Sequence, residues 1–191
     1  MRTPDQEKKS RILDSTSSII MNQGIAAVSL SKIAKEANIA SGTIYTYFAN
    51  KDDLLKQVYL NRKDRVAQAI AQIDDAGDPA QEVSRLMDRM YAFGQTNLDD
   101  LLLIREFNQS PLMAQLGIDP SEAYAGFEPL AELTKRGVDA GVFVPDVYPV
   151  IMSYAYTPVV EYLLAIRNGG ITPEQVPFAN IKKLSLRAIV R

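Results

Sequence analysis

The segment that most constrains this chain is Ser29 to Phe48, SLSKIAKEANIASGTIYTYF. Ser29 suits a helix N-cap, because a serine hydroxyl accepts a hydrogen bond from a free N–H at a helix start. Ile33 and Ala37 follow at the spacing that places them on one face of a helix. Asn38 tolerates the left-handed backbone conformation that turns a chain after a helix. The pattern therefore predicts a short helix that ends in a tight turn.

A second short helix is predicted directly after this turn. Ser41 is placed to cap it, and Ile44 and Phe48 lie four residues apart, facing inward. Ala34, in the first helix, is small enough to let the two helices approach closely. Two helices joined in this way form a helix-turn-helix, whose second helix enters the major groove of DNA. An ordinary helical hairpin inside a core gives the same pattern, so the motif alone leaves both interpretations open.

The segment before the motif adds basic side chains. Thr3 and Pro4 predict the N-cap and first turn of a helix that carries Lys8, Lys9 and Arg11. These cations are candidates for phosphate contacts, or form a solvated face. Residues 1–65 carry a net charge of +4 and residues 66–191 a net charge of −6. A basic end on an acidic body is typical of a polyanion-binding domain attached to another domain.

The segment after the motif predicts a helix capped by Asn50. Asp52 and Asp53 fall in its first turn, where the helix dipole favours carboxylates. Lys51 falls at the same positive end, which disfavours a cation. A phosphate bound there would account for Lys51, and a flexible surface lysine is the alternative. The helix is predicted to run on through Ile73 and end near Gly77.

Taken together, these segments resemble one known family. Gly24-Ile25, Ile33–Ala37, Ser41–Phe48 and Asn50–Leu55 are similar to the N-terminal domain of the TetR/AcrR family of transcriptional regulators. The resemblance covers about residues 5–60. Asn38 stands where the family most often has glycine, and Ser41 stands where it often has lysine or another residue.

We therefore expect an all-α protein with a three-helix helix-turn-helix domain at its N-terminus. The predicted divisions are residues 1–50 for this domain, 51–77 for a connecting helix, and 78–191 for a larger helical domain for ligand binding and dimerisation. The helices predicted in the last part are Pro79–Asn97, Leu98–Asn108, Leu112–Leu116, Asp119–Ala140 with a bend at Pro129, Asp146–Asn168 with a bend at Pro158, and Pro173–Val190, with an extended link over residues 141–145.

The predicted DNA-contacting surface is rich in hydroxyl groups. The resemblance implies that Tyr45 and Tyr47 contact phosphates or bases and that Lys51 contacts a phosphate. The second helix has no arginine, which argues against bidentate reading of guanine from it. We expect strong salt dependence, with specificity from hydroxyls, methyls and groove shape. The candidate residues are Ser31, Lys32, Ser41, Gly42, Thr43, Tyr45, Thr46, Tyr47 and Lys51.

The remaining expectations concern a dimer and an effector. The resemblance implies that the last two helices pair with those of a second copy; packing inside a monomer is the alternative. It also implies a cavity for a small apolar or aromatic effector; for each residue taken singly, a core position is the alternative. The dimer-interface candidates are Val159, Tyr162, Ile166, Ile181 and Leu184. The ligand-pocket candidates are Met87, Met90, Tyr91, Phe107, Tyr124, Phe127 and Tyr154.

Composition excludes several classes of site. The chain has no cysteine and no histidine, which removes disulfides, thiol nucleophiles, His-based triads and the usual zinc sites. No cofactor or metal is expected, and no catalytic residue is proposed. The first ten residues lack the apolar core of a signal peptide, and no apolar run is judged long enough to span a bilayer, so we expect a cytoplasmic protein without a membrane partner.

The expected function is a DNA-binding transcriptional regulator, not an enzyme. It would act as a homodimeric repressor that a small apolar or aromatic effector releases from a palindromic double-stranded DNA operator. A transcriptional activator or a ligand-independent DNA-binding protein of the same fold is the alternative. A helical enzyme that uses the central pocket is the alternative from a different class.

Overall fold

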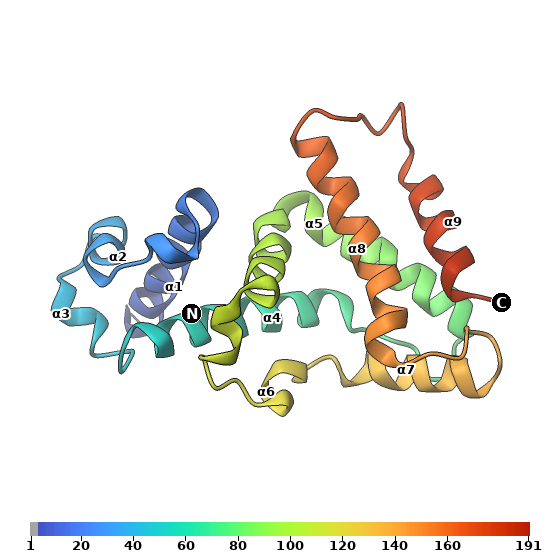
Figure 1. The fold of residues 1–191 in the computed structure, drawn as a ribbon, viewed down its shortest axis with the longest axis horizontal. Helices are drawn as coiled ribbons and strands as arrows, with labels where there is room; N and C mark the ends of the chain where they lie inside the picture. The colour runs from blue at the N-terminus through green and yellow to red at the C-terminus, as the bar shows by residue number, and fades with distance from the viewer. Residues whose placement is uncertain (1–3) are drawn as a thin grey trace. The chain divides into compact units, whose positions relative to one another are not determined.

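The computed structural model describes residues 4–191, and this part of the chain is almost entirely helical (Figure 1). Within it, the β-structure consists of one isolated antiparallel bridge between Phe143 and Val190. The all-α prediction is confirmed; Thr3, the predicted first N-cap, lies outside the described residues. The helices are α1 (Pro4–Gln23), α2 (Leu30–Glu36), α3 (Ser41–Ile44), α4 (Lys51–Ile70), α5 (Pro79–Gln109), α6 (Pro120–Tyr124), α7 (Glu128–Asp139), α8 (Tyr148–Arg167) and α9 (Phe178–Ile189), with 3₁₀ helices η1 (Ile25–Ala27) and η2 (Pro111–Ala114).

The chain forms two compact units. Unit 1 contains Met1–Lys63 and Leu102–Ala123, and unit 2 contains Asp64–Leu101 and Tyr124–Arg191. α4 and α5 therefore each contribute residues to both units. The functional division expected at residues 50 and 77 stays a prediction.

The core of unit 1 uses the apolar faces that the sequence spacing indicated. α1 packs against η1 and α2, and α2 packs against α3. Burying each large aliphatic side chain contributes about 1.5–3 kcal/mol to folding. Helices this short are unstable alone, so this packing is what stabilises them. The buried residues include Ile12, Ile19, Ile20, Ile33, Ala34, Ala37, Ile44, Phe48, Leu54, Leu55 and Val58.

α4 ends at Ile70, before the predicted end near Gly77. The segment after it is held by side chains in place of helical hydrogen bonds. The Asp74 carboxylate accepts from Ala76 N at 3.0 Å, and Arg136 of α7 donates to the carbonyls of Gly77 at 2.6 Å and Asp74 at 3.1 Å. These bonds satisfy backbone groups that a longer helix would have used.

α5 is interrupted at Asn97, whose φ of −130° and ψ of 33° are not helical. The Asn97 side chain donates to the carbonyl of Phe93 at 3.1 Å and accepts from Arg65 of α4 at 3.1 Å. The prediction of two helices that meet after Asn97 is confirmed as a local break in a continuous element.

The helix predicted over Asp119–Ala140 is wrong, because the structure divides it into α6 and α7. Gly126 has a φ of +81° between them, a conformation that ends a right-handed helix and favours glycine. Pro129 lies in the first turn of α7 and not at a bend. Proline suits that position, since the N–H it lacks has no helical partner there.

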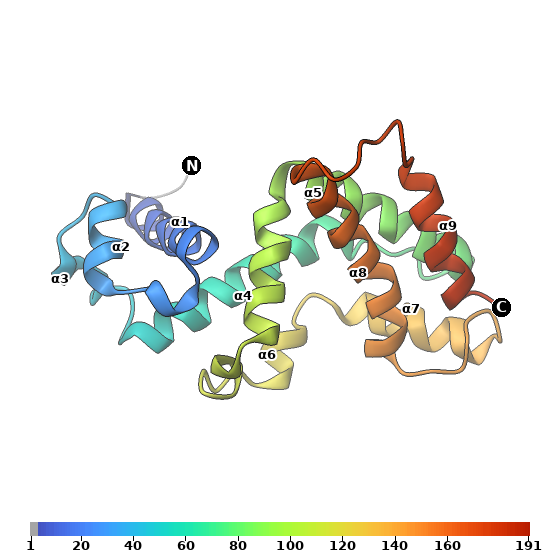
Figure 2. The same cartoon turned by 45° about the horizontal axis from the view of Figure 1, so that its top comes forward.

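α8 and α9 lie side by side in unit 2 (Figures 1 and 2). α8 contains Pro158, as predicted. α9 starts at Phe178, later than the predicted Pro173. The segment before it forms a turn in which Thr172 N donates to Gln175 Oε1 at 3.0 Å.

α8 is long and apolar enough, by length and composition alone, to cross a membrane, with a mean hydropathy of 1.3. This corrects the expectation that no apolar run reaches that length. Its packing against α7 and α9 explains the composition, because one side of the helix belongs to the core of unit 2. The buried residues of α8 are Ile151, Ala155, Val159, Val160, Tyr162 and Leu163.

Candidate nucleic-acid interface

The turn of the predicted helix-turn-helix is present. Ser29 caps α2 by accepting a hydrogen bond from Lys32 N at 3.4 Å. Asn38 has a φ of +52°, the left-handed conformation expected from the sequence. Ile39 N then donates to the carbonyl of Ala34 at 3.0 Å, which closes the turn. The backbone is thereby redirected into α3 within a few residues.

α3 is shorter than predicted, and its start differs. Ala40 occupies the N-cap position and makes no side-chain cap bond, so the prediction that Ser41 caps this helix is wrong. Ser41 is the first helical residue, with an exposed side chain. The helix ends at Ile44, and a turn continues to Tyr47. Its inward side is held by Ile44 and Phe48, which are 1% and 2% exposed.

The predicted DNA-contacting residues lie largely on the outside of this motif. Tyr45 projects furthest into solvent, at 60% exposure, although its aromatic ring is apolar. Thr43, Tyr47 and Lys51 are half-buried, and the rest of the set is exposed: Ser31, Lys32, Ser41, Gly42, Tyr45 and Thr46. The Lys32 side chain already makes a hydrogen bond within the protein, since its Nζ donates to Gln23 Oε1 at 3.1 Å.

Lys51 begins α4, as predicted. Asn50 Oδ1 accepts from Asp53 N at 2.9 Å, and Asp53 Oδ2 accepts from Ala49 N at 2.8 Å. This reciprocal pair fixes the first turn of α4 and holds Lys51 at a helix N-terminus. Backbone N–H groups and a lysine at one helix end form an arrangement suited to a phosphate.

Tyr47 makes a contact that sequence reasoning missed. Its hydroxyl donates to Asp5 Oδ1 of α1 at 2.6 Å, across 42 residues of sequence. This hydrogen bond raises the pKa of Tyr47 above the usual value for tyrosine. Lys9 of α1 lies over the ring of the next residue, Phe48, with its Nζ 5.7 Å from the ring centroid. No local sequence signal links α1 to the end of α3, because the contact depends on the fold.

Comparison with known proteins bears directly on this motif. Residues 12–58 match the model of the family described as bacterial regulatory proteins, tetR family. A helix-turn-helix transcriptional regulator of Haemophilus influenzae, itself uncharacterised, is 44% identical over 57 residues, 30% of each chain. A TetR family transcription regulator from Marinobacter aquaeolei superposes with a TM-score of 0.83 at 21% identity over 100% of this chain and 99% of that one. The family model covers 47 of the 191 residues, so the similarity to the tetR family is established for this part of the chain.

The curated relatives are matched over only part of their length. Three further curated relatives are matched over 34–65% of their own length. The fold similarity extends further. FadR from Bacillus subtilis, whose structure is a complex with stearoyl-CoA, superposes with a TM-score of 0.70 at 19% identity, covering 94% of this chain and 98% of FadR.

The ligand-pocket candidates are dispersed. Phe107 belongs to the core of unit 1, with its ring 5.4 Å from that of Tyr59. The others lie in unit 2, where Met87 and Met90 are buried and Phe127 is half-buried. Tyr91 stacks on Phe178 at 4.2 Å.

Two of these candidates lie at the surface, and their role in a ligand site stays a prediction. Tyr124 and Tyr154 are 48% and 51% exposed, so neither lies in an enclosed cavity of unit 2. The spacing of apolar residues predicts which face of a helix they share, but it does not predict which of them are exposed at the surface.

Two of the five dimer candidates are contradicted by their burial, and the other three stay predictions. Val159 and Tyr162 are 0% and 3% exposed inside unit 2, which leaves them no surface for a second chain. The Tyr162 hydroxyl donates to the carbonyl of Val176 at 2.6 Å. Ile166 and Ile181 are half-buried, and Leu184 is 62% exposed. Of the five predicted residues, Leu184 is the one most available to a partner.

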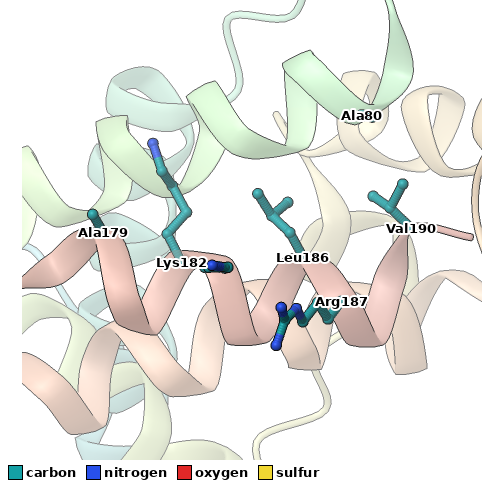
Figure 3. Close-up of a pocket in the computed structure, with 7 residues that line it drawn as sticks. Ala80, Ala179, Lys182, Leu186, Arg187 and Val190 are labelled. Carbon is teal, nitrogen blue, oxygen red and sulfur yellow. The ribbon is translucent and has the colours of Figure 1, made fainter.

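A groove of about 410 Å³ lies between the start of α5 and α9 (Figure 3). Leu186 of α9 and Val190, the residue after α9, extend toward α5 beside Ala80. Lys182 pairs with Asp88 of α5 at 2.7 Å. The lining contains none of the predicted pocket residues: it consists of Ala80, Ala179, Lys182, Lys183, Leu186, Arg187 and Val190. Among the residues that the structure describes, no cluster of acidic side chains could hold a metal ion.

Proposed function

We propose that this chain is a DNA-binding transcriptional regulator that reads DNA with the outer side of α3 and of the turn that follows it. The observation that carries the proposal is the contrast within five residues between Ile44 and Phe48, which are buried, and Tyr45, which is 60% exposed. A short helix and turn that are anchored by apolar side chains and present an aromatic ring outward are suited to a groove.

The polar groups on the outer side of the motif define how DNA would be read. The hydroxyls of Ser41, Thr43 and Thr46 donate to or accept from base edges and phosphates, and threonine methyls pack against thymine methyls. Gly42 lets the backbone come close to the duplex, while Lys51 adds a cationic phosphate contact at the start of α4. Specificity would come from these neutral groups, and much of the affinity from cations.

The test begins with selection of bound sequences from random DNA. Binding of the selected site is then measured by fluorescence anisotropy for the wild type and for the double variant Tyr45→Ala with Lys51→Ala. We expect a loss of at least tenfold, because the variant removes one cation and one large contact surface. Lys135→Ala is the matched control, since it removes one exposed cation from unit 2. Unchanged binding and an unchanged footprint in the double variant would refute the assignment.

We propose further that the protein binds DNA as a homodimer, because one such motif contacts few bases and helix-turn-helix proteins pair on half-sites about one helical turn apart. Exposed apolar side chains on α8 and α9 support this: Val150, Tyr154 and Leu184 are 38%, 51% and 62% exposed. Val150 and Tyr154 are four residues apart, on one face of α8. A palindromic selected site would agree with a dimer, and a strictly monomeric protein at micromolar concentration would contradict it.

The proposal includes repression relieved by a small apolar or aromatic effector. The buried methionines Met87 and Met90 of α5 suit an adaptable apolar site, and the structurally similar FadR was crystallised with stearoyl-CoA. An effector must bind the DNA-free form more tightly than the DNA-bound form. A screen of acyl-CoAs and aromatic compounds for release of bound DNA tests this. Failure of every compound would favour a ligand-independent regulator of the same fold.

A further inference from the structure

We infer that Asp5 competes with DNA phosphate for the hydroxyl of Tyr47, so that this carboxylate lowers the affinity of the free protein for DNA. The inference rests on the proposed DNA-binding function and adds a residue that neither the sequence pattern nor the comparisons single out. It starts from the 2.6 Å hydrogen bond between Tyr47 Oη and Asp5 Oδ1.

The first step concerns the number of hydrogen bonds that the Tyr47 hydroxyl can donate. A tyrosine hydroxyl has one hydrogen to donate, and phosphate oxygens only accept. While Tyr47 donates to Asp5, it has no hydrogen for a phosphate. The hydroxyl must therefore leave the carboxylate before it can bind the DNA backbone as a donor.

The second step concerns charge. Asp5 lies in the first turn of α1, where the helix dipole favours an ionised carboxylate. A hydrogen bond to an ionised acceptor is stronger than one between neutral groups. In the DNA-free protein the Asp5 carboxylate thus accepts the hydrogen bond that a DNA phosphate would otherwise accept. As DNA approaches, it also repels the incoming phosphates.

The third step separates competition from positioning. If Asp5 only oriented the ring of Tyr47 for DNA, removal of Asp5 would weaken binding. Competition gives the opposite sign: removal of Asp5 strengthens binding, and the contribution of the Tyr47 hydroxyl becomes visible only then. The sign of one substitution therefore decides between the two roles.

The experiment measures DNA affinity by anisotropy at two salt concentrations for the wild type, Asp5→Ala, Tyr47→Phe and the double variant. We expect Asp5→Ala to bind roughly two- to tenfold more tightly, with the larger gain at low salt. Tyr47→Phe should change affinity less than about twofold in the wild type and by more than that in the Asp5→Ala background.

Glu7→Gln is the matched control, since Glu7 lies in the same first turn and carries the same charge. Equal gains for Glu7→Gln and Asp5→Ala would reduce the effect to net charge and overturn the inference. Weaker binding by Asp5→Ala would overturn it as well.

A second readout needs no DNA. The hydrogen bond to Asp5 raises the pKa of Tyr47. Absorbance titrations of each protein and of its Tyr47→Phe version give the titration of Tyr47 by difference. We expect the pKa of Tyr47 to be lower in Asp5→Ala than in the wild type. A wild type that binds no DNA would refute the proposed function while the titration still reports the contact. A wild type that binds DNA but shows no effect of Asp5→Ala would refute the inference alone.

Discussion

Arg62 of α4 donates from Nη2 to the carboxylate of Asp14 on α1 at 2.6 Å, although its own side chain is only 4% exposed. Its Nη2 and Nε also donate to the hydroxyl of Ser17 at 2.9 and 3.1 Å. A buried guanidinium needs these acceptors, because an uncompensated buried charge is costly. The contact fixes the part of α4 that belongs to unit 1 against α1.

Removing the Arg62 side chain should destabilise the protein. We expect Arg62→Ala to lower the free energy of unfolding by about 2–4 kcal/mol, since packing, hydrogen bonds and the ion pair are lost together. Urea denaturation followed by circular dichroism gives the value. Lys35→Ala, which removes an exposed cation of α2, is the control and should change stability by less than about 0.5 kcal/mol. Equal stability of the two variants would show that the Arg62 contact is not made in solution.

The backbone conformation of Asn38 predicts opposite effects of two substitutions. Its φ of +52° is accessible to glycine without strain but is unfavourable for a β-branched residue. Asn38→Gly should leave stability unchanged or raise it slightly, and Asn38→Val should lower it by about 1–2 kcal/mol. Thermal unfolding of both variants checks the ordering. A Val variant as stable as the wild type would mean that the turn adopts another conformation.

The features that sequence reasoning predicted are those with local causes. The left-handed Asn38, the cap by Asn50 and the break at Asn97 each depend on a few neighbouring residues and were all found. The division between α6 and α7 was missed, because the segment around Gly126 continues an apolar helical pattern.

Features that depend on residues far apart in the chain were not predicted from the sequence. The partners of the Asp5–Tyr47 and Asp14–Arg62 bonds are 42 and 48 residues apart, and no periodicity relates them. The assignment of Val159 to a dimer face failed for a related reason. A helical period shows which side of a helix is apolar, but not whether that side meets its own chain or a second one.

Gly42 offers a way to separate folding from DNA binding. A Cβ added there meets no atom within 4 Å, so Gly42→Ala should keep the fold and raise helix stability by up to about 1 kcal/mol. If the backbone of α3 comes against the duplex, the added methyl should weaken DNA binding severalfold. Thermal unfolding and anisotropy on the same samples measure both effects. Unchanged affinity would show that DNA does not approach this part of α3.

Tyr148 predicts how stability changes at high pH. Burial is the main cause that raises its pKa to about 12, and the neighbouring Tyr124 adds to it. The unfolded chain has a tyrosine pKa of about 10, so folding favours the neutral phenol. The resulting stabilisation is complete below pH 10 and is lost as the pH rises from 10 toward 12.

Urea denaturation at several pH values between 9 and 12 tests this with Tyr148→Phe, which cannot ionise at that position. We expect the variant to lose less stability than the wild type over this range. Parallel loss in both proteins would contradict the burial of the Tyr148 hydroxyl.

Leu184 predicts the assembly state. Its side chain is 62% exposed on α9, and Val150 and Tyr154 are exposed on α8, which packs against α9. A protein that pairs through these helices would bury Leu184. Leu184→Glu replaces apolar contact with a charge that must be desolvated at a two-fold interface, where it also meets its own copy. We expect a folded monomer by light scattering and at least tenfold weaker binding to a palindromic site, because each protomer then contacts one half-site alone. Lys183→Glu changes the adjacent residue, which lines the groove beside α5, and should leave the dimer intact. A Leu184→Glu protein that stays dimeric would place the interface on another surface of the chain.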